Sequence, residues 1–517
     1  DRRFSPSMED QDHEYSKNDG EVRKSLLLQE KPCFTVHEAI ESAGFSRFQY
    51  ILCAIGGLSW LASATEIMLL AILSPSLKCE WQLTSVQQAL CSTSVFLGWM
   101  VSSPIWGRVC DIHGRRKGLM AASLVGVVFG ILTSFAPSFY LFLVARFGVG
   151  FSVGGMAQSV TVTAEFLPVA SKARWLIILK SFFAIGTAIL TALAIVILPN
   201  LGWRWLVAYA ALPMAAFGIC CWWLPESVRF DVSQGNIVAA RATLDRIARF
   251  NGKSLPPGEL EVETEESSSD MSDLLKPSHR RTTLQLWIIW TLCGLLYYGL
   301  AIYTSLLLHS PLDQCSSASS LGEISSKVKR EVECRQLTTE NYIDIIVTTM
   351  SEVPGLLLTM YAVDLIGRKA SFAAGFAIFS TSCALLVMCL PRFVIVASMF
   401  VGRSAIAVVF QIAYIYSTEV YPTSLRAQGL GTASGWGRFG SMITPVITEM
   451  LFAHDLIFPP IVFIVGGGVG AILSILLPIE TSEKARKVRF YVERWQQLVS
   501  GGAQRRNRLV LCYSIAF

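Results

Sequence analysis

Charged residues are scarce in this chain of 517 residues. Asp, Glu, Lys and Arg together make up 16% of it, against about 25% in an average soluble domain. Hydrophobic residues make up 52%, and the mean hydropathy is +0.49. A soluble protein of this size needs more polar side chains to cover its surface. The composition therefore excludes a disordered protein, a secreted disulfide scaffold and a typical cytosolic enzyme, and the excess apolar surface must face lipid.

Several signatures of bound groups and of catalysis are also lacking. The thirteen cysteines are mostly single and lack the spacing of metal ligands, so we expect neither a metal nor a cofactor. The glycine run 466–468 lacks the Gly-Lys-Ser/Thr of an ATP-binding loop. The net charge of +5 is too balanced to favour nucleic acid as a partner. No cluster of nucleophile and base occurs in the apolar stretches, so we expect no enzyme.

Long hydrophobic runs are present instead, each about as long as a helix that crosses a bilayer. There are six before a polar insert and six after it: 48–73, 84–107, 118–136, 139–164, 175–198, 205–224, 284–309, 342–363, 370–391, 393–418, 428–452 and 457–479. The sequence therefore predicts an all-α, multi-pass membrane protein with twelve transmembrane helices in two six-helix bundles.

The connectors predict the orientation, because lysine and arginine concentrate in the short loops after spans 2, 4, 8 and 10. We expect a cytosolic tail over 1–47, a bundle over 48–224, a cytosolic linker over 225–283, a second bundle over 284–479 and a cytosolic tail over 480–517. Within the linker, the pattern of 236–250 predicts an amphipathic helix at the inner leaflet. The lipid bilayer is thus the first expected partner.

The two halves repeat short motifs at nearly constant spacing, which indicates an internal duplication. Asp111-x-x-Gly114-Arg115-Arg116 returns as Asp364-x-x-Gly367-Arg368-Lys369. Glu165 and Pro168 return as Glu419 and Pro422, each followed by an arginine, and each half closes on a Leu-Pro run. Conformational latch candidates are the charged and glycine residues of these repeats: Asp111, Gly114, Arg115, Arg116, Glu165, Arg174, Asp364, Gly367, Arg368, Glu419 and Arg426. Such charge networks can break and reform between two states.

The repeated loop resembles the signature of the major facilitator superfamily, Gly-x-x-x-Asp-x-x-Gly-Arg-[Arg/Lys], which begins here at Gly107. Further runs resemble the synaptic vesicle glycoprotein-related transporters: Cys79-Glu-Trp81, Ala164-Glu-Phe-Leu-Pro168, Gly202-Trp-Arg-Trp-Leu206, Leu224-Pro-Glu-Ser227 and Thr418-Glu-Val-Tyr-Pro422. The resemblance implies the major facilitator fold, with two bundles around a central cavity that opens alternately to each side. It implies residence in the plasma membrane or in an intracellular vesicle membrane.

Polar residues inside the spans are costly and are therefore functional candidates. The candidates for the solute cavity are Ser63, Glu66, Lys180, Tyr298, Glu352 and Arg438. Arg146 and Arg403, at matching places in the fourth and tenth spans, are candidates for ion pairs between helices. A structural ion pair is the competing interpretation for every charged residue of the set, and Lys180 could also reach the interface with its long side chain. Glu66 and Glu352 are candidates for binding a coupling proton.

The solute is a small organic molecule if the resemblance extends to function. The related transporters commonly carry an aspartate in place of Ser63 and an acidic residue in place of Lys180. This exchange of charge favours an organic anion or zwitterion. The paired glutamines of hexose carriers and the Gly-Pro antiporter signature are both missing, which disfavours sugar uptake and drug antiport.

Two functions remain open at this point. One is a secondary active or facilitative transporter that works by alternating access. The other is a vesicle membrane protein of the same fold that binds or scaffolds and does not transport. In the segment 310–341, which we expect on the side away from the cytosol, Cys315 and Cys334 are candidates for a disulfide.

Overall fold

The computed structural model describes residues 33–261, 271–309, 337–388 and 390–481. Most of the two predicted tails lies outside the described residues, as do Cys315 and Cys334. The described part is helical apart from one parallel pair of short strands, β1 (Cys33–Phe34) and β2 (Glu259–Leu260).

Each predicted span corresponds to a helix or to two consecutive helices. The first half contains α3 (Arg47–Trp81), α4 (Ser85–His113), α5 (Arg115–Ser134), α6 (Phe139–Met156) with α7 (Gln158–Glu165), α8 (Val169–Leu201), and α9 (Trp203–Ala210) with α10 (Leu212–Cys220). The second half contains α13 (Arg280–His309), α15 (Thr339–Met350) with α16 (Glu352–Ile366), α17 (Arg368–Val387), α18 (Arg392–Val420), α19 (Thr423–His454) and α20 (Phe458–Ile475).

Eleven of these segments in the described part of the chain are long and apolar enough to cross a membrane. The twelfth, α19, has 32 residues but is less apolar, because it carries several glycines together with Arg438 and Glu449. It packs against α13 and, in the other half, α4, so protein covers much of its length. A helix of this kind is stable inside a bundle although its hydropathy is low.

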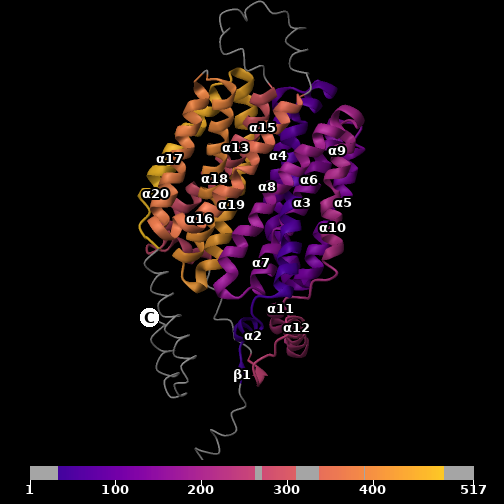
Figure 1. Cartoon of the computed structure of the whole chain (residues 1–517), viewed down its shortest axis with the longest axis vertical. Coiled ribbons are helices and arrows are strands. Elements are labelled where there is room, and N and C mark those ends of the chain that lie inside the picture. Colours follow the sequence, from indigo (N-terminus) through magenta and orange to yellow (C-terminus); the bar gives the residue numbers. More distant parts are fainter. Residues whose placement is uncertain (1–32, 262–270, 310–336, 389, 482–517) are drawn as a thin grey trace, which may run out of the picture.

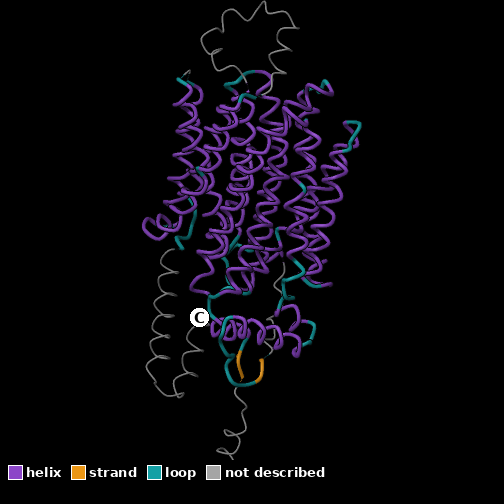
Figure 2. Tube along the Cα trace, turned by 45° about the vertical axis from the view of Figure 1, so that its right-hand side comes forward, coloured by secondary structure: helices purple, strands orange, loops and turns teal. Residues whose placement is uncertain are grey.

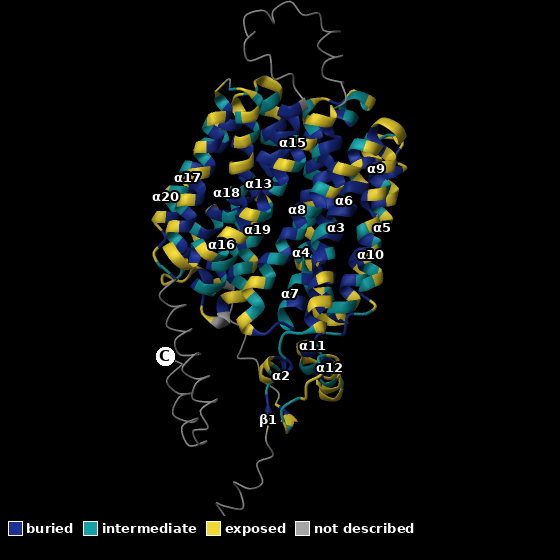
Figure 3. Cartoon of the chain, viewed as in Figure 1, coloured by how far each residue is buried: buried dark blue, intermediate teal, exposed yellow. Residues whose placement is uncertain are grey.

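The helices form two bundles that lie side by side (Figure 1), with α3 to α10 in one and α13 to α20 in the other. Contacts between the bundles involve α4 with α19, α8 with α15 and α16, and α3 with α13. Exposed residues lie mostly on the periphery of the two bundles (Figure 3), and many are large and apolar, such as Leu124, Val196 and Ile472. This distribution suits a protein whose sides face lipid. The predicted all-α fold with two six-helix bundles is confirmed.

One end of the molecule, here called the linker end, carries α2 (Val36–Ala43), α11 (Val228–Ser233), α12 (Ile237–Phe250) and the two strands (Figure 2). The opposite end is called the far end. The predicted amphipathic helix is α12, whose buried face includes Leu244 and Ile247. The sequence predicted that this face contacts lipid at the inner leaflet. The structure differs, because α12 packs against α2 and α3.

Polar contacts fasten this small unit to the first bundle. The side chain of Asn251 accepts a hydrogen bond from the backbone N–H of Phe48 at 3.1 Å and donates one to the carbonyl of Ala43 at 3.1 Å. Glu41 of α2 accepts a hydrogen bond from the backbone N–H of Val169, the first residue of α8, at 2.6 Å. The segment α2 and the linker are thereby joined to the same bundle.

Candidate transport site

The linker end of the first bundle holds a charge network centred on Arg115. Its guanidinium pairs with Asp111 at 3.4 Å and with Glu165 at 3.3 Å, and it donates a hydrogen bond to Gln158. Gly114 precedes it with φ +99°, a backbone conformation that favours glycine. The network therefore ties α4, α5 and α7 together.

The second bundle repeats this network around Arg368. The guanidinium contacts both carboxylate oxygens of Glu419, at 2.9 and 3.0 Å, and pairs with Asp364 at 3.6 Å. Gly367 has φ +86°, as Gly114 does in the first half. The pairing with Glu419 is bidentate, which makes it the tighter of the two equivalent contacts.

Each network includes two further residues that the sequence analysis did not assign. Glu226 accepts hydrogen bonds from the backbone N–H groups of Arg115 and Arg116, at 2.7 and 3.1 Å, and Ser227 donates one to Glu165. In the second half Glu480 takes the place of Glu226 and Thr481 that of Ser227. The sequence signal for these four residues is the Leu-Pro run that closes each half. The repeat of this run was noted, but no role was assigned to it.

Other predicted latch residues lie at the edge of these networks. Arg116 donates a side-chain hydrogen bond to the carbonyl of Trp222 at 2.8 Å. Arg174 and Arg426 are exposed, and neither forms an ion pair with a residue that the structure describes.

Two buried ion pairs lie deeper in the bundles. In the first bundle Arg146 of α6 pairs with Glu66 of α3 at 2.8 Å, and both side chains are completely buried. In the second, Arg403 of α18 pairs with Glu352 of α16 at 2.8 Å, and Tyr297 donates a hydrogen bond to the same carboxylate. The structure thus places the two predicted acids of the cavity set in contact with the two predicted ion-pair arginines. Each pair holds together helices of one bundle.

Lys180 lies where the bundles meet, and its environment differs. Its ammonium nitrogen is buried and has no hydrogen-bond partner, although part of its side chain remains accessible. It lies 4.4 Å from the ring centre of Phe410 and 4.9 Å from that of Tyr414, both on α18 of the opposite bundle. The nearby Glu352 is already engaged by Arg403 and Tyr297. Lys180 is therefore held by cation–π contacts and not by an acid.

Arg438 makes the reciprocal contact from the second bundle. Its guanidinium lies 5.5 Å from the ring centre of Trp99, which belongs to α4 of the first bundle. It forms no ion pair with any residue in the described part of the chain. Both Lys180 and Arg438 thus carry positive charge to the boundary between the bundles without a carboxylate partner.

Aromatic side chains from both bundles surround these two cations. Tyr298 packs against Phe96 and Trp99 of α4, with ring centres 4.8 and 6.4 Å apart, and Tyr297 packs against Phe183 and Phe410. The predicted candidate Ser63 is buried and donates its hydrogen bond to the carbonyl of Ser59. Trp99, Phe410 and Tyr414 were not predicted as site residues from the sequence. Apolar spans contain many aromatic residues, and only the packing of the helices shows which of them contact the two cations.

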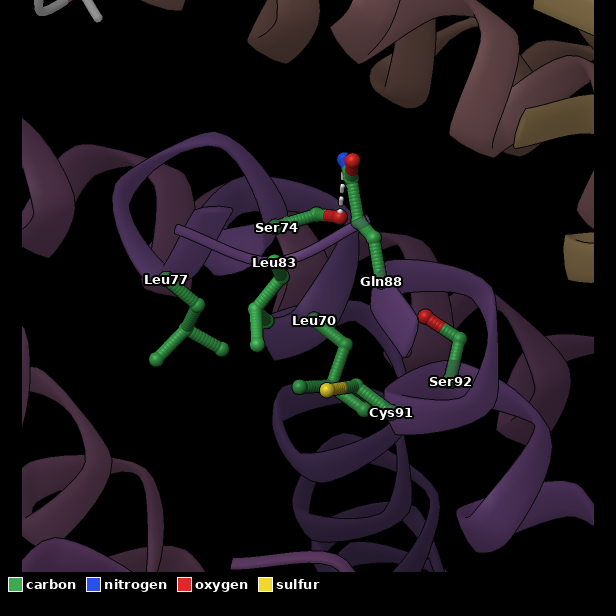
Figure 4. Close-up of a pocket in the computed structure, with 7 residues that line it drawn as sticks. All are labelled: Leu70, Ser74, Leu77, Leu83, Gln88, Cys91 and Ser92. Atoms are coloured by element: carbon green, nitrogen blue, oxygen red, sulfur yellow. Dashed lines mark hydrogen bonds between the residues drawn. The ribbon is translucent and has the colours of Figure 1, made fainter. Parts of the chain in front are cut away.

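A second polar cluster lies near the far end. Gln88 of α4 donates a hydrogen bond to Ser74 of α3 at 2.7 Å, at the edge of a small hollow (Figure 4) that also involves Cys91. The Ser74 hydroxyl donates in turn to Glu449 of α19 at 3.3 Å, and Thr93 donates to the carbonyl of Met442 at 3.2 Å. These last two hydrogen bonds join the two bundles. The far end is therefore closed in this structure.

The described residues contain no group of three or more metal-binding side chains. Cys79, in the last turn of α3, is disulfide-bonded, whereas the other described cysteines are not disulfide-bonded.

The comparisons agree with this architecture. The family model described as sugar (and other) transporter matches residues 14–487. Synaptic vesicle 2-related protein of Xenopus laevis is 43% identical over 469 residues, which cover 91% of this chain and 85% of the relative. The protein of the same name from Rattus norvegicus is 42% identical over 469 residues, with the same coverage.

Among solved structures, the xylose transporter XylE from E. coli in a partially occluded inward open conformation has a TM-score of 0.63. It is 16% identical and covers 84% of this chain and 98% of its own, so the likeness concerns the fold. The duplicated bundles, the repeated charge networks and the family match lead to one conclusion. This multi-pass membrane protein belongs to the sugar (and other) transporter family of the major facilitator superfamily.

Proposed function

We propose that the chain carries a small organic anion across the membrane by alternating access. The observation that carries the proposal is the pair of cations at the boundary between the bundles, Lys180 and Arg438, neither of which has an acid partner among the described residues. Unpaired charges inside a membrane protein are costly and usually mark a solute path. An anion that enters between the bundles would supply the missing partner for both.

The buried acids support this choice of solute. Glu66 and Glu352 are each neutralised by an arginine, so the charge that remains around Lys180 and Arg438 is positive. A cation would find no free carboxylate at this level among the described residues, and a zwitterion would find only half of its partners. A sugar, the solute named for XylE, carries no charge to match Lys180 and Arg438.

The aromatic rings add a second element of selectivity. Trp99 and Phe410 already hold the two cations from opposite bundles. A flat anion could stack on these rings while its acidic group binds the cations. We propose that the linker end faces the cytosol, in the plasma membrane or a vesicle membrane. The disulfide at Cys79 supports this orientation, because disulfides persist in oxidising compartments.

Uptake by purified protein in liposomes tests the proposal. We expect Lys180→Gln and Arg438→Gln each to reduce the flux of organic anions about 10- to 100-fold, since each removes a charge-assisted contact worth about 1.5 to 3 kcal/mol. Lys180→Glu should also raise the relative uptake of organic cations. The matched control is Arg249→Gln on α12, which removes the same charge far from the boundary and should leave the flux unchanged.

Two outcomes would contradict the proposal. An unchanged preference between anionic and cationic tracers in Lys180→Glu would remove Lys180 from the solute path. Binding of anions without any flux in the wild-type protein would favour the alternative, a vesicle membrane protein of this fold that binds or scaffolds. Ligand-induced thermal shifts in detergent, measured on the same preparations, separate binding from flux.

A further inference from the structure

Three helices meet in the polar cluster at the far end, and they belong to both bundles. Ser74 of α3 and Gln88 of α4 come from the first bundle, and Glu449 of α19 comes from the second. Gln88 donates to Ser74, and Ser74 donates to Glu449. Any movement that opens the far end must separate Glu449 from Ser74.

Glu449 is almost completely buried, with 3% of its surface exposed. One carboxyl oxygen accepts the hydrogen bond from Ser74, at the long distance of 3.3 Å, and the other has no hydrogen-bond partner. The buried acids Glu66 and Glu352 each contact an arginine, whereas Glu449 forms no ion pair with a described residue. A carboxylate buried in this way is costly, because neither water nor a cation compensates its charge.

The charged and titratable groups around Glu449 come from two neighbouring helices. On α3, the positively charged Lys78 lies one turn beyond Ser74. On α4, the thiol of Cys91 lies within electrostatic reach of Glu449 and is buried. Among the described residues of α13, α18 and α20, which also pack on α19, no charged group acts on this carboxyl.

We propose that Glu449 is a proton-binding site whose protonated form closes the far end. When the bundles separate there, water reaches the carboxyl group and stabilises its charged form, so the proton leaves to the solution on that side. When they close again, the carboxyl takes up one proton from the same solution and buries as a neutral group. The proton therefore binds more tightly to the closed state than to the open one, so acid favours closure and alkaline solution favours opening.

Such a gate rests on the proposed transport function, because protonation of Glu449 would control whether the solute site opens at the far end. It also stands apart from it, since the gate responds to protons whether or not a solute is present. For a single proton, the ratio of closed to open molecules can change by at most about tenfold per pH unit.

Distances between spin labels on the two bundles test the proposal without any solute. Labels at Val86→Cys on α4 and Ala453→Cys on α19 occupy exposed positions at the far end. In full-length protein in lipid nanodiscs, we expect the short-distance population to grow as the solution is taken from about pH 9 to about pH 5, the range in which buried carboxyl groups titrate. Glu449→Gln, a neutral isostere, should hold the short distance at every pH.

The matched control is Glu80→Gln, which removes a carboxyl group at the far end that pairs with Arg204 within the first bundle. It should keep the pH response of the wild type, and Glu449→Asp should keep a response with a shifted midpoint. The proposal is overturned if the wild-type distances do not depend on pH, or if Glu449→Gln still responds. A pH-dependent gate in a protein without anion flux would support this inference and reject the transport proposal.

Discussion

Two arginine–glutamate pairs lie deep inside the bundles. Glu66 and Arg146 are fully buried, and Arg146 also donates to the backbone carbonyl of Glu66 at 2.6 Å. In a low-dielectric interior, such an ion pair stabilises the fold little more than an apolar pair of the same shape would. Loss of one partner, however, leaves the other charge buried without compensation. These residues therefore matter more for integrity than for solute recognition.

Replacement of one partner should be far more harmful than replacement of both. We expect Arg146→Met to destabilise the protein by about 3 to 5 kcal/mol, because Glu66 then stays buried without a cation. The double variant Glu66→Gln with Arg146→Met should recover most of the loss. Thermal unfolding in detergent measures both. The exposed pair Arg204–Glu80 is the control, and Arg204→Met should cost at most about 1 kcal/mol. Equal stability of the single and double variants would contradict the argument.

The sequence identified these charged residues but not their partners. Arg146 and Arg403 were predicted to form ion pairs, while Glu66 and Glu352 were placed with the cavity, because chain position does not tell which face of a helix turns inward. Glu449 was overlooked within a predicted span. Its importance depends on contacts with α3 and α4, which lie hundreds of residues away in sequence.

At the scale of helices, the start of α5 and the start of α17 are built alike. A glycine with positive φ begins each turn, and the carboxylate of Glu226 or Glu480 accepts two backbone N–H groups there. The free N–H groups and the dipole of a helix start favour such a negative charge. The repeat therefore conserves a cap as well as an ion pair.

Neutralising either cap should loosen its helix start to a similar extent. Glu226→Gln and Glu480→Gln each remove the charge of an otherwise similar side chain, at an expected cost of about 1 to 2 kcal/mol. Amide hydrogen exchange should then be about 5- to 30-fold faster at Arg115 and Arg116, or at Arg368 and Lys369. The untouched bundle serves as the control in each variant. An effect in one half alone would show that the two caps are not equivalent.

Helix positions were largely predictable, because twelve apolar windows correspond to the observed segments. The breaks inside three of them were not. They fall at Ala157, Ala211 and Ser351, after a glycine pair in the first case and before a proline in the other two. A hydropathy window averages over such local features and therefore does not reveal a break. Helix α19 shows a different effect, because it is less apolar than the other spans and is covered by neighbouring helices.

For the molecule as a whole, the order of the spans and the repeated motifs were sufficient to predict the two bundles. The unit formed by α2, α12 and the strands was not predictable, because it joins segments more than 200 residues apart. Orientation in the membrane stays a prediction, based on basic connectors and supported by the disulfide at Cys79.

Labelling of native cysteines tests this orientation. Cys33 has an exposed thiol at the linker end. In intact cells, a membrane-impermeant maleimide should therefore reach it only after the plasma membrane is permeabilised. Cys33→Ser should abolish that part of the signal and is the control. Cys79 should become reactive from the other side only after reduction. Labelling of Cys33 in intact cells would reverse the orientation.

The parallel pairing of β1 with β2 has a practical consequence for dissecting the protein into fragments. Strand β2 and Asn251 lie after the first bundle in sequence, yet their partners precede α3 or begin it. A chain divided at residue 225 would part these partners, whereas one divided after residue 261 would keep them on one polypeptide. Co-expressed halves should therefore reassemble best when the first fragment ends beyond the second strand.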